Sequence, residues 1–287
     1  MDINQIITDK IIAILERGTT TQGKRWTGTT SHGIPTNAKT GEQYRGINVL
    51  VLWAELADRD YASSQWLTYN QAAELGAQVR KGERSVLCCY YKTVEKNGDQ
   101  DETDGDKYFM AKPFWLFNVA QIDNLPPDMF TSAPVCVFNP VEEAEHILAN
   151  SRAQIYYGFD CACYSPASDK ICLPQRGSFT SEASFYATAL HELSHWSGHE
   201  SRLNRQFGRR FGDDAYAFEE LVAELGAAFT VGHLGLLDAT IEAHADYVAS
   251  WIKVLKSDKK AIFTAASQAA KASDFILSIE ATASTEL

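Results

Sequence analysis

SEASFYATALHELSHWSG, residues 181–198, is the stretch that determines how the C-terminal half of the chain folds. It predicts a single helix, because small and apolar residues run through it without a proline and Gly198 is a helix stop. His191 and His195 are four positions apart, so both imidazoles project from one face of that helix. With Glu192 beside them, the pattern is typical of a metal centre in which two histidines bind the ion and the carboxylate takes a proton from water.

A third ligand is needed to complete such a site. The best source is YAFEELVAELGAAF, residues 216–229, a strongly helical run with Glu220 and Glu224 four apart on one side. In gluzincins of the thermolysin type, a downstream helix donates a Glu to the metal and an acidic residue one turn later orients a zinc-bound histidine. We therefore predict Glu220 as the ligand and Glu224 as its partner. An exchange of these two roles and ligation by His199, which continues the four-residue spacing, are the alternatives.

The same segments suggest the rest of the site. Tyr216 lies one turn before Glu220 and could donate a hydrogen bond to a developing oxyanion, although a packed tyrosine explains it equally well. Two histidines and a carboxylate predict Zn²⁺, and the same ligands suit Mn²⁺ or Co²⁺. The strand expected at 170–174 precedes the active-site helix, as does the edge strand that binds extended peptide in zincins.

Composition places the chain among ordinary globular proteins. With 287 residues and 45% hydrophobic residues it can bury a full core without disulfides. No run of eighteen apolar residues and no cleavage site for a signal peptide is present, so we expect a cytoplasmic protein with no membrane partner. The six cysteines lack the spacing of a disulfide framework or a zinc knuckle, and we interpret them as reduced thiols.

Periodicity and prolines predict an α+β chain of two domains. NLPPDMFTSAPVCVFNP, residues 124–140, contains four prolines and is the expected linker between a domain at 1–123 and a second at 141–287. The first domain is expected to contain a helix at 3–17, a short helix at 68–76, and a β-hairpin of 85–93 with 107–117 around an acidic tip. The second should contain short strands followed by long helices at about 181–197, 214–235, 239–256 and 259–281.

The N-terminal half alternates aromatic and basic residues. Residues 1–94 contain eleven Lys and Arg against nine Asp and Glu, whereas the whole chain has a formal charge of −11. Single-stranded nucleic acid binds by stacking bases on aromatic rings while cations follow the phosphates. The candidates for such contacts are Lys24, Arg25, Trp26, Tyr44, Arg45, Trp66, Arg80 and Lys81. For Trp66 the alternative is a role in packing the helix that follows it.

Several long segments in the same order resemble the ArdC-type antirestriction proteins of conjugative plasmids. They are YRGINVLVLW at 44–53, WLTYNQAAELGAQVRKGE at 66–83, ALHELSHWSGHESRLNR at 189–205, EELVAELGAAF at 219–229 and WIKVLKSDKKAIFTAASQAAKASDFIL at 251–277. The resemblance implies an N-terminal domain that binds single-stranded DNA and a C-terminal zincin domain similar to the Spartan and SprT proteases. It also implies protection of plasmid DNA from restriction as the DNA enters a recipient cell.

The favoured hypothesis is therefore a metalloprotease that is localised by single-stranded DNA and cuts a protein substrate, such as a restriction enzyme. The main alternative is a non-proteolytic protein that shields single-stranded DNA, with a zinc site of mainly structural role. Glu192 favours the first hypothesis, because a structural metal site needs no general base. A third hypothesis is a metallopeptidase whose N-terminal half binds protein instead of DNA.

Overall fold

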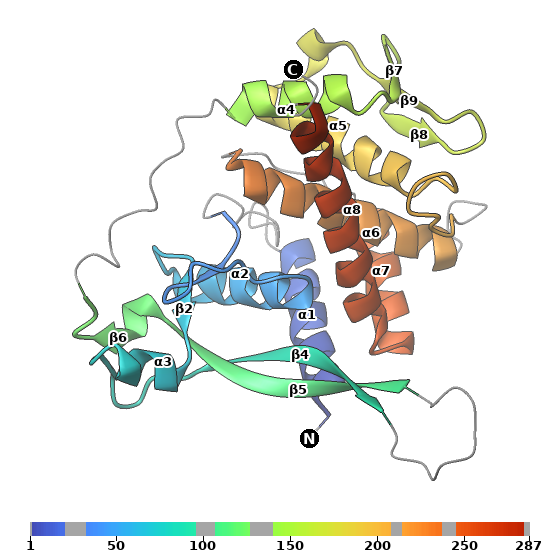
Figure 1. The fold of residues 1–287 in the computed structure, drawn as a ribbon. Helices are drawn as coiled ribbons and strands as arrows, with labels where there is room; N and C mark the ends of the chain where they lie inside the picture. Colours follow the sequence, from blue (N-terminus) through green and yellow to red (C-terminus); the bar gives the residue numbers. More distant parts are fainter. Residues whose placement is uncertain are drawn as a thin grey trace.

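The computed structural model describes residues 2–20, 33–95, 107–126, 140–207, 214–236 and 245–283 (Figure 1). It confirms the mixed helix and sheet architecture. The N-terminal half begins with α1 (Ile3–Thr20), where the apolar spacing predicted a helix, and also contains α2 (Ile47–Arg59), which was not predicted. None of the helices in the described ranges combines the length and apolar character that a membrane span requires.

The N-terminal half contains a four-stranded sheet. Its order is β1 (Thr36–Asn37), β2 (Gln65–Leu67), β5 (Lys107–Asn118) and β4 (Val86–Glu95). Strands β4 and β5 form the long strand pair at the bottom of Figure 1. The whole of β4 pairs antiparallel with residues 107–116 of β5, which confirms the predicted hairpin. The acidic tip expected between them falls at 96–106, outside the described residues.

The short helix α3 (Tyr69–Glu74) begins and ends where the sequence predicted. Thr68 caps it by accepting a hydrogen bond from the backbone of Gln71, and the side chain of Gln71 returns the contact in a capping box. Gly76 follows with φ of 73°, a left-handed conformation that glycine adopts without a steric cost. The helix packs with β3 (Gln78–Val79), the turn η2 (Val119–Gln121) and β6 (Ile122–Asp123) around a small separate core.

The C-terminal half starts with α4 (Pro140–Asn150) and a three-stranded sheet of order β7 (Gln154–Tyr157), β9 (Lys170–Leu173) and β8 (Cys163–Ser165). After the turn η4 (Arg176–Ser178) come α5 (Glu182–Ser197), α6 (Asp214–Leu234), α7 (Ala245–Ser257) and α8 (Ala261–Ala283). The strand at 170–174 was expected at the sheet edge, and this was wrong: β9 is central, β8 is an edge strand, and both contact α5.

One hydrophobic cluster runs through both halves of the chain. It joins buried residues of α1 and α2 to those of α5 to α8. Trp53 of α2 lies 5.9 Å from the ring of Phe229 in α6, and its indole nitrogen donates to the carbonyl of Gly33. Thr8 of α1 donates to the carbonyl of Lys259 just before α8. The helices of the N-terminal half are thus packed directly against the helices that carry the site. The predicted boundary at 124–140 lies largely outside the described residues, and the division into two domains stays a prediction.

Candidate metal centre

Helix α5 presents the two histidines of the sequence motif. Ser181 caps the helix by accepting from the backbone of Ser184, and the Ser184 hydroxyl accepts in turn from the backbone of Ser181. The helix then runs without interruption to Ser197 and ends at Gly198. Because one helical turn separates them, His191 and His195 face the same side, with ring centroids 4.8 Å apart.

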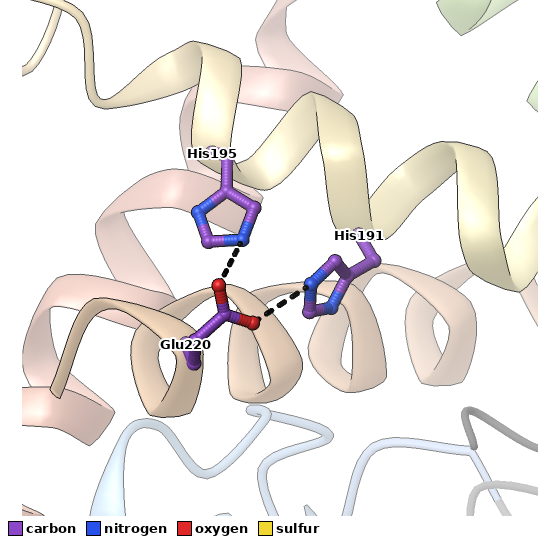
Figure 2. Close-up of side chains that lie close together, drawn as sticks. All are labelled: His191, His195 and Glu220. Atoms are coloured by element: carbon purple, nitrogen blue, oxygen red, sulfur yellow. Dashed lines mark ion pairs between the residues drawn. The ribbon is translucent and has the colours of Figure 1, made fainter. Parts of the chain in front are cut away.

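Both imidazoles converge on one carboxylate of the neighbouring helix α6. Nε2 of His191 lies 3.6 Å from Oε2 of Glu220, and Nε2 of His195 lies 3.5 Å from Oε1 of the same residue (Figure 2). One ligand atom from each of the three side chains lies within 4.8 Å of the others. The two helices therefore place two nitrogens and a carboxylate around a single point.

The opposite ring nitrogens face two further carboxylates of α6. Nδ1 of His191 is 3.5 Å from Glu224, and Nδ1 of His195 is 3.2 Å from Glu219. Burial by itself lowers the pKa of each imidazole, but the neighbouring carboxylates outweigh it and raise the pKa of His195 to about 9. Glu220, Glu224 and Glu192 likewise outweigh burial and raise the pKa of His191.

A buried arginine supports this arrangement. Arg205 lies in the loop after α5 and pairs with Glu219 at 2.7 Å, and it also donates to the carbonyl of Ser194 and the hydroxyl of Ser197. Sequence reasoning missed both Arg205 and Glu219. The only signal in the sequence was that Glu219 stands next to Glu220. The argument from i, i+4 spacing selected Glu220 and passed over Glu219. The position of Arg205 depends on how the loop folds back over the helix end.

Glu192 lies beside the two histidines and is buried. Burial raises the pKa of its carboxyl, while His191 and His195 act in the opposite direction. The backbone N–H of Tyr164 in β8 donates a hydrogen bond to this carboxylate. The edge strand of this sheet that reaches the general-base candidate is therefore β8, whereas the expected edge strand at 170–174 is the central strand β9.

The residues present suit a divalent metal ion. Glu224 Oε1 and His191 Nδ1 are buried and have no hydrogen bond with the described residues, although His191 Nδ1 faces the other oxygen of Glu224. Nitrogen and oxygen ligands bind Zn²⁺, Mn²⁺ and Co²⁺ at about 2 Å, so three donors gathered this closely can share one ion. Carboxylates behind zinc-binding imidazoles commonly fix the ring orientation and increase ligand basicity.

The other candidates for the site have different positions. His199 follows Gly198, bonds through Nδ1 to the hydroxyl of Ser201 at 2.8 Å, and is not among the three clustered ligands. Glu224 faces the outer nitrogen of His191 and not the shared point. Tyr216 is half-buried on the first turn of α6, and its role at an oxyanion stays a prediction.

The predicted DNA-binding residues that the structure describes differ in burial and in charge pairing. Trp66 is fully buried in the main core, so the prediction that its ring stacks on a base is wrong, and it is Leu67 that shares the small core of the helix that follows. Tyr44 is half-buried and stacks on Phe114, Arg45 pairs with Asp274 of α8, and Arg80 pairs with Glu83 and Asp123. Lys81 is exposed. Lys24, Arg25 and Trp26 lie outside the described residues.

Comparison with known proteins assigns the family. The model of the N-terminal domain of anti-restriction factor ArdC matches residues 1–117, and a zincin-like metallopeptidase model matches residues 142–268. The crystal structure of the metal-free antirestriction ArdC protein from plasmid R388 superposes with a TM-score of 0.82 at 38% identity, covering 98% of this chain and 99% of that one. The chain belongs to the ArdC-type antirestriction family.

Other relatives of this ArdC-type chain differ in length. The Mn(II)-bound form of the R388 protein gives a TM-score of 0.80. Protein y4eC of Sinorhizobium fredii is 36% identical over 96% of this chain and 91% of its own length. A DNA primase TraC of Escherichia coli is 40% identical over 96% of this chain, but the match spans 27% of the primase. Nearly the whole of this chain thus matches about a quarter of the longer primase.

Proposed function

We propose that this ArdC-type protein is a metal-dependent endopeptidase that binds single-stranded DNA and protects incoming conjugative plasmid DNA from restriction. In this proposal, residues 1–123 bind the DNA, 124–140 connect the two parts, and 141–287 hydrolyse a protein substrate or restriction enzyme met on it. The observation that carries the proposal is the convergence of His191 and His195 on Glu220 with Glu192 buried beside them.

His191, His195 and Glu220 would hold the ion, which is Zn²⁺ or, with the same ligands, Mn²⁺ or Co²⁺. When bound, a divalent ion supplies Lewis acidity that polarises a peptide carbonyl and makes water a better nucleophile. Glu219 and Glu224 hold the two imidazoles from behind, each through an Nδ1 atom. The histidines keep their Nε2 atoms directed at the shared point.

Glu192 does the proton transfer. Its carboxylate accepts a proton from the attacking water and returns it to the leaving amine, and the hydrogen bond from the Tyr164 amide keeps it in place. An extended peptide can align along β8, whose outer edge is not paired with any described strand. Recognition through backbone hydrogen bonds places few demands on substrate side chains.

The test compares wild-type protein with Glu192→Gln, with Glu200→Gln as a matched control at an exposed carboxylate after α5. Metal content, binding to an oligothymidylate, and protection of plasmid DNA in a restricting recipient are measured in parallel. We expect Glu192→Gln to bind metal and DNA normally and to lose protection. Protection equal to wild type would contradict a hydrolytic role and favour shielding of DNA with a structural metal site.

A further inference from the structure

The β4–β5 hairpin has two unlike faces. Because facing residues in an antiparallel pair share a side, Val86 with Leu116 lies on one face and Leu87 with Trp115 on the other. Val86, Cys88 and Leu116 are at most 2% exposed and belong to the main core. Further along this second face Cys89 also belongs to the main core, but at the other end Leu87 is only half-buried and Trp115 is open to solvent.

Trp115 is the exception among the tryptophans that the structure describes. It is 47% exposed, whereas Trp53, Trp66, Trp196 and Trp251 are at most 6% exposed. Two positions along the same face, Phe117 lies 6.5 Å from the ring of Tyr69, which is 52% exposed. We call the surface made by Tyr69, Leu87, Trp115 and Phe117 the Trp115 face. Helix α3 covers the Phe117 end of it, and Trp115 stays open to solvent.

Positive charge lies next to this face. Lys81 and Arg84, in the turn that connects β3 to β4, are exposed and form no ion pair with any described residue. The nearby carboxylates of Glu83 and Asp123 both pair with Arg80. Residues 1–94 as a whole have a net formal charge of +2 in a chain of −11. The two unpaired cations suit phosphates close to the exposed rings.

We propose that the Trp115 face binds single-stranded DNA, with unpaired bases stacking on Trp115 and Tyr69 and with Lys81 and Arg84 facing the phosphates. The inference rests on the proposed DNA-binding function and assigns it to a surface. Exposed aromatic rings bind any base through its flat face, but only where the bases are not already stacked in a duplex. A single-stranded ligand is therefore favoured over a double-stranded one.

Tyr90 provides an internal comparison. It is 51% exposed on the same strand pair, but it shares its face with Phe114 and packs against that ring at 6.1 Å. Lys112 lies directly opposite Tyr90 in the strand register, so this second aromatic group also has a cation beside it. Tyr90 thus matches Trp115 in exposure but lies on the other face of the hairpin, where its ring packs against Phe114.

The experiment measures binding of a fluorescein-labelled oligothymidylate by anisotropy. We expect Trp115→Ala and Tyr69→Ala each to weaken binding by about fivefold to a hundredfold. Trp115→Phe should restore most of the loss, because its ring still stacks, and Tyr90→Ala should bind like wild type. An unlabelled duplex should compete poorly with the single strand. Thermal unfolding of each variant checks that the fold is intact.

The outcomes separate this inference from the function on which it rests. If the wild-type protein fails to bind the oligothymidylate, the proposed DNA-binding function itself is wrong. If wild type binds and the Trp115 and Tyr69 variants bind equally well, the DNA-binding surface lies elsewhere and this assignment is overturned. Loss of binding in Tyr90→Ala alone would transfer the assignment to the opposite face.

Discussion

Arg205 and Glu219 form an ion pair at 2.7 Å in which each side chain is only 4% exposed, and the same carboxylate lies 3.2 Å from Nδ1 of His195. Because Arg205 also donates to the carbonyl of Ser194, it ties the C-terminal end of α5 to α6. The orientation of one imidazole thus depends on a residue ten positions further along the chain.

Replacing Arg205 with Met should destabilise the protein and weaken its metal site. The substitution leaves Glu219 buried without its cation, which costs about 3–5 kcal/mol of unfolding free energy. Loss of a group that orients a metal-binding histidine typically lowers metal affinity about 10–100-fold. Urea unfolding in the presence of a chelator measures the first effect, and metal titration measures the second.

The double variant Arg205→Met/Glu219→Gln is the control, because it removes both charges of the pair. It should recover much of the stability, since no buried charge is left unpaired, while metal affinity stays low. Wild-type stability in the single Arg205 variant would show that the pair contributes nothing to the fold.

Gly198 should not tolerate alanine. Its backbone has φ of −80°, which alanine adopts easily, but a Cβ there would lie 2.7 Å from the guanidinium of Arg205. Displacing this tightly bonded group should cost about 1–3 kcal/mol of unfolding free energy, as overpacking does elsewhere. Gly177→Ala is the matched control, because no atom lies within 4 Å of its Cβ position. Equal melting temperatures for the two variants would contradict this account.

Local patterns in the sequence predicted local structure well. The short helix predicted at 68–76 and the β4–β5 hairpin follow from contacts within a few residues or from strand alternation. His191 and His195 followed from helical geometry in the same way. In each case, the interaction that fixes the structure is between residues close in sequence or on one element.

Features that depend on how distant segments meet were missed. Arg205 reaches Glu219 only because the loop after α5 folds back, and neither residue stands out by spacing. Trp66 was proposed to contact DNA because basic residues follow it in the sequence. Its strand, however, lies inside the sheet, and its side chain is buried. Trp115, whose exposure is unusual, could not be told from a core tryptophan without the hairpin register.

Metal affinity should rise with pH up to about 9. In the metal-free protein, Glu219 and Glu220 overcome the effect of burial and raise the pKa of His195 to about 9. Below that pH the imidazole holds a proton that the ion must displace, so uptake of Mn²⁺ or Zn²⁺ releases protons. Calorimetry in buffers of different ionisation enthalpy counts these protons. In Glu219→Gln the plateau should occur at lower pH, since one carboxylate that raises the pKa is lost. Affinity independent of pH between 6 and 9 would contradict the prediction.

The third ligand can be identified by three single substitutions. Glu220 lies between both Nε2 atoms, so Glu220→Ala should abolish tight binding of Zn²⁺ and Mn²⁺. Glu224→Ala removes only the carboxylate behind Nδ1 of His191 and should weaken binding about 10–100-fold. His199→Ala should bind like wild type, because its ring is bonded to Ser201 beyond the end of α5. A larger loss in Glu224→Ala than in Glu220→Ala would exchange the two roles, and loss of metal in His199→Ala would make His199 the ligand. Circular dichroism of each metal-free variant separates these effects on binding from unfolding.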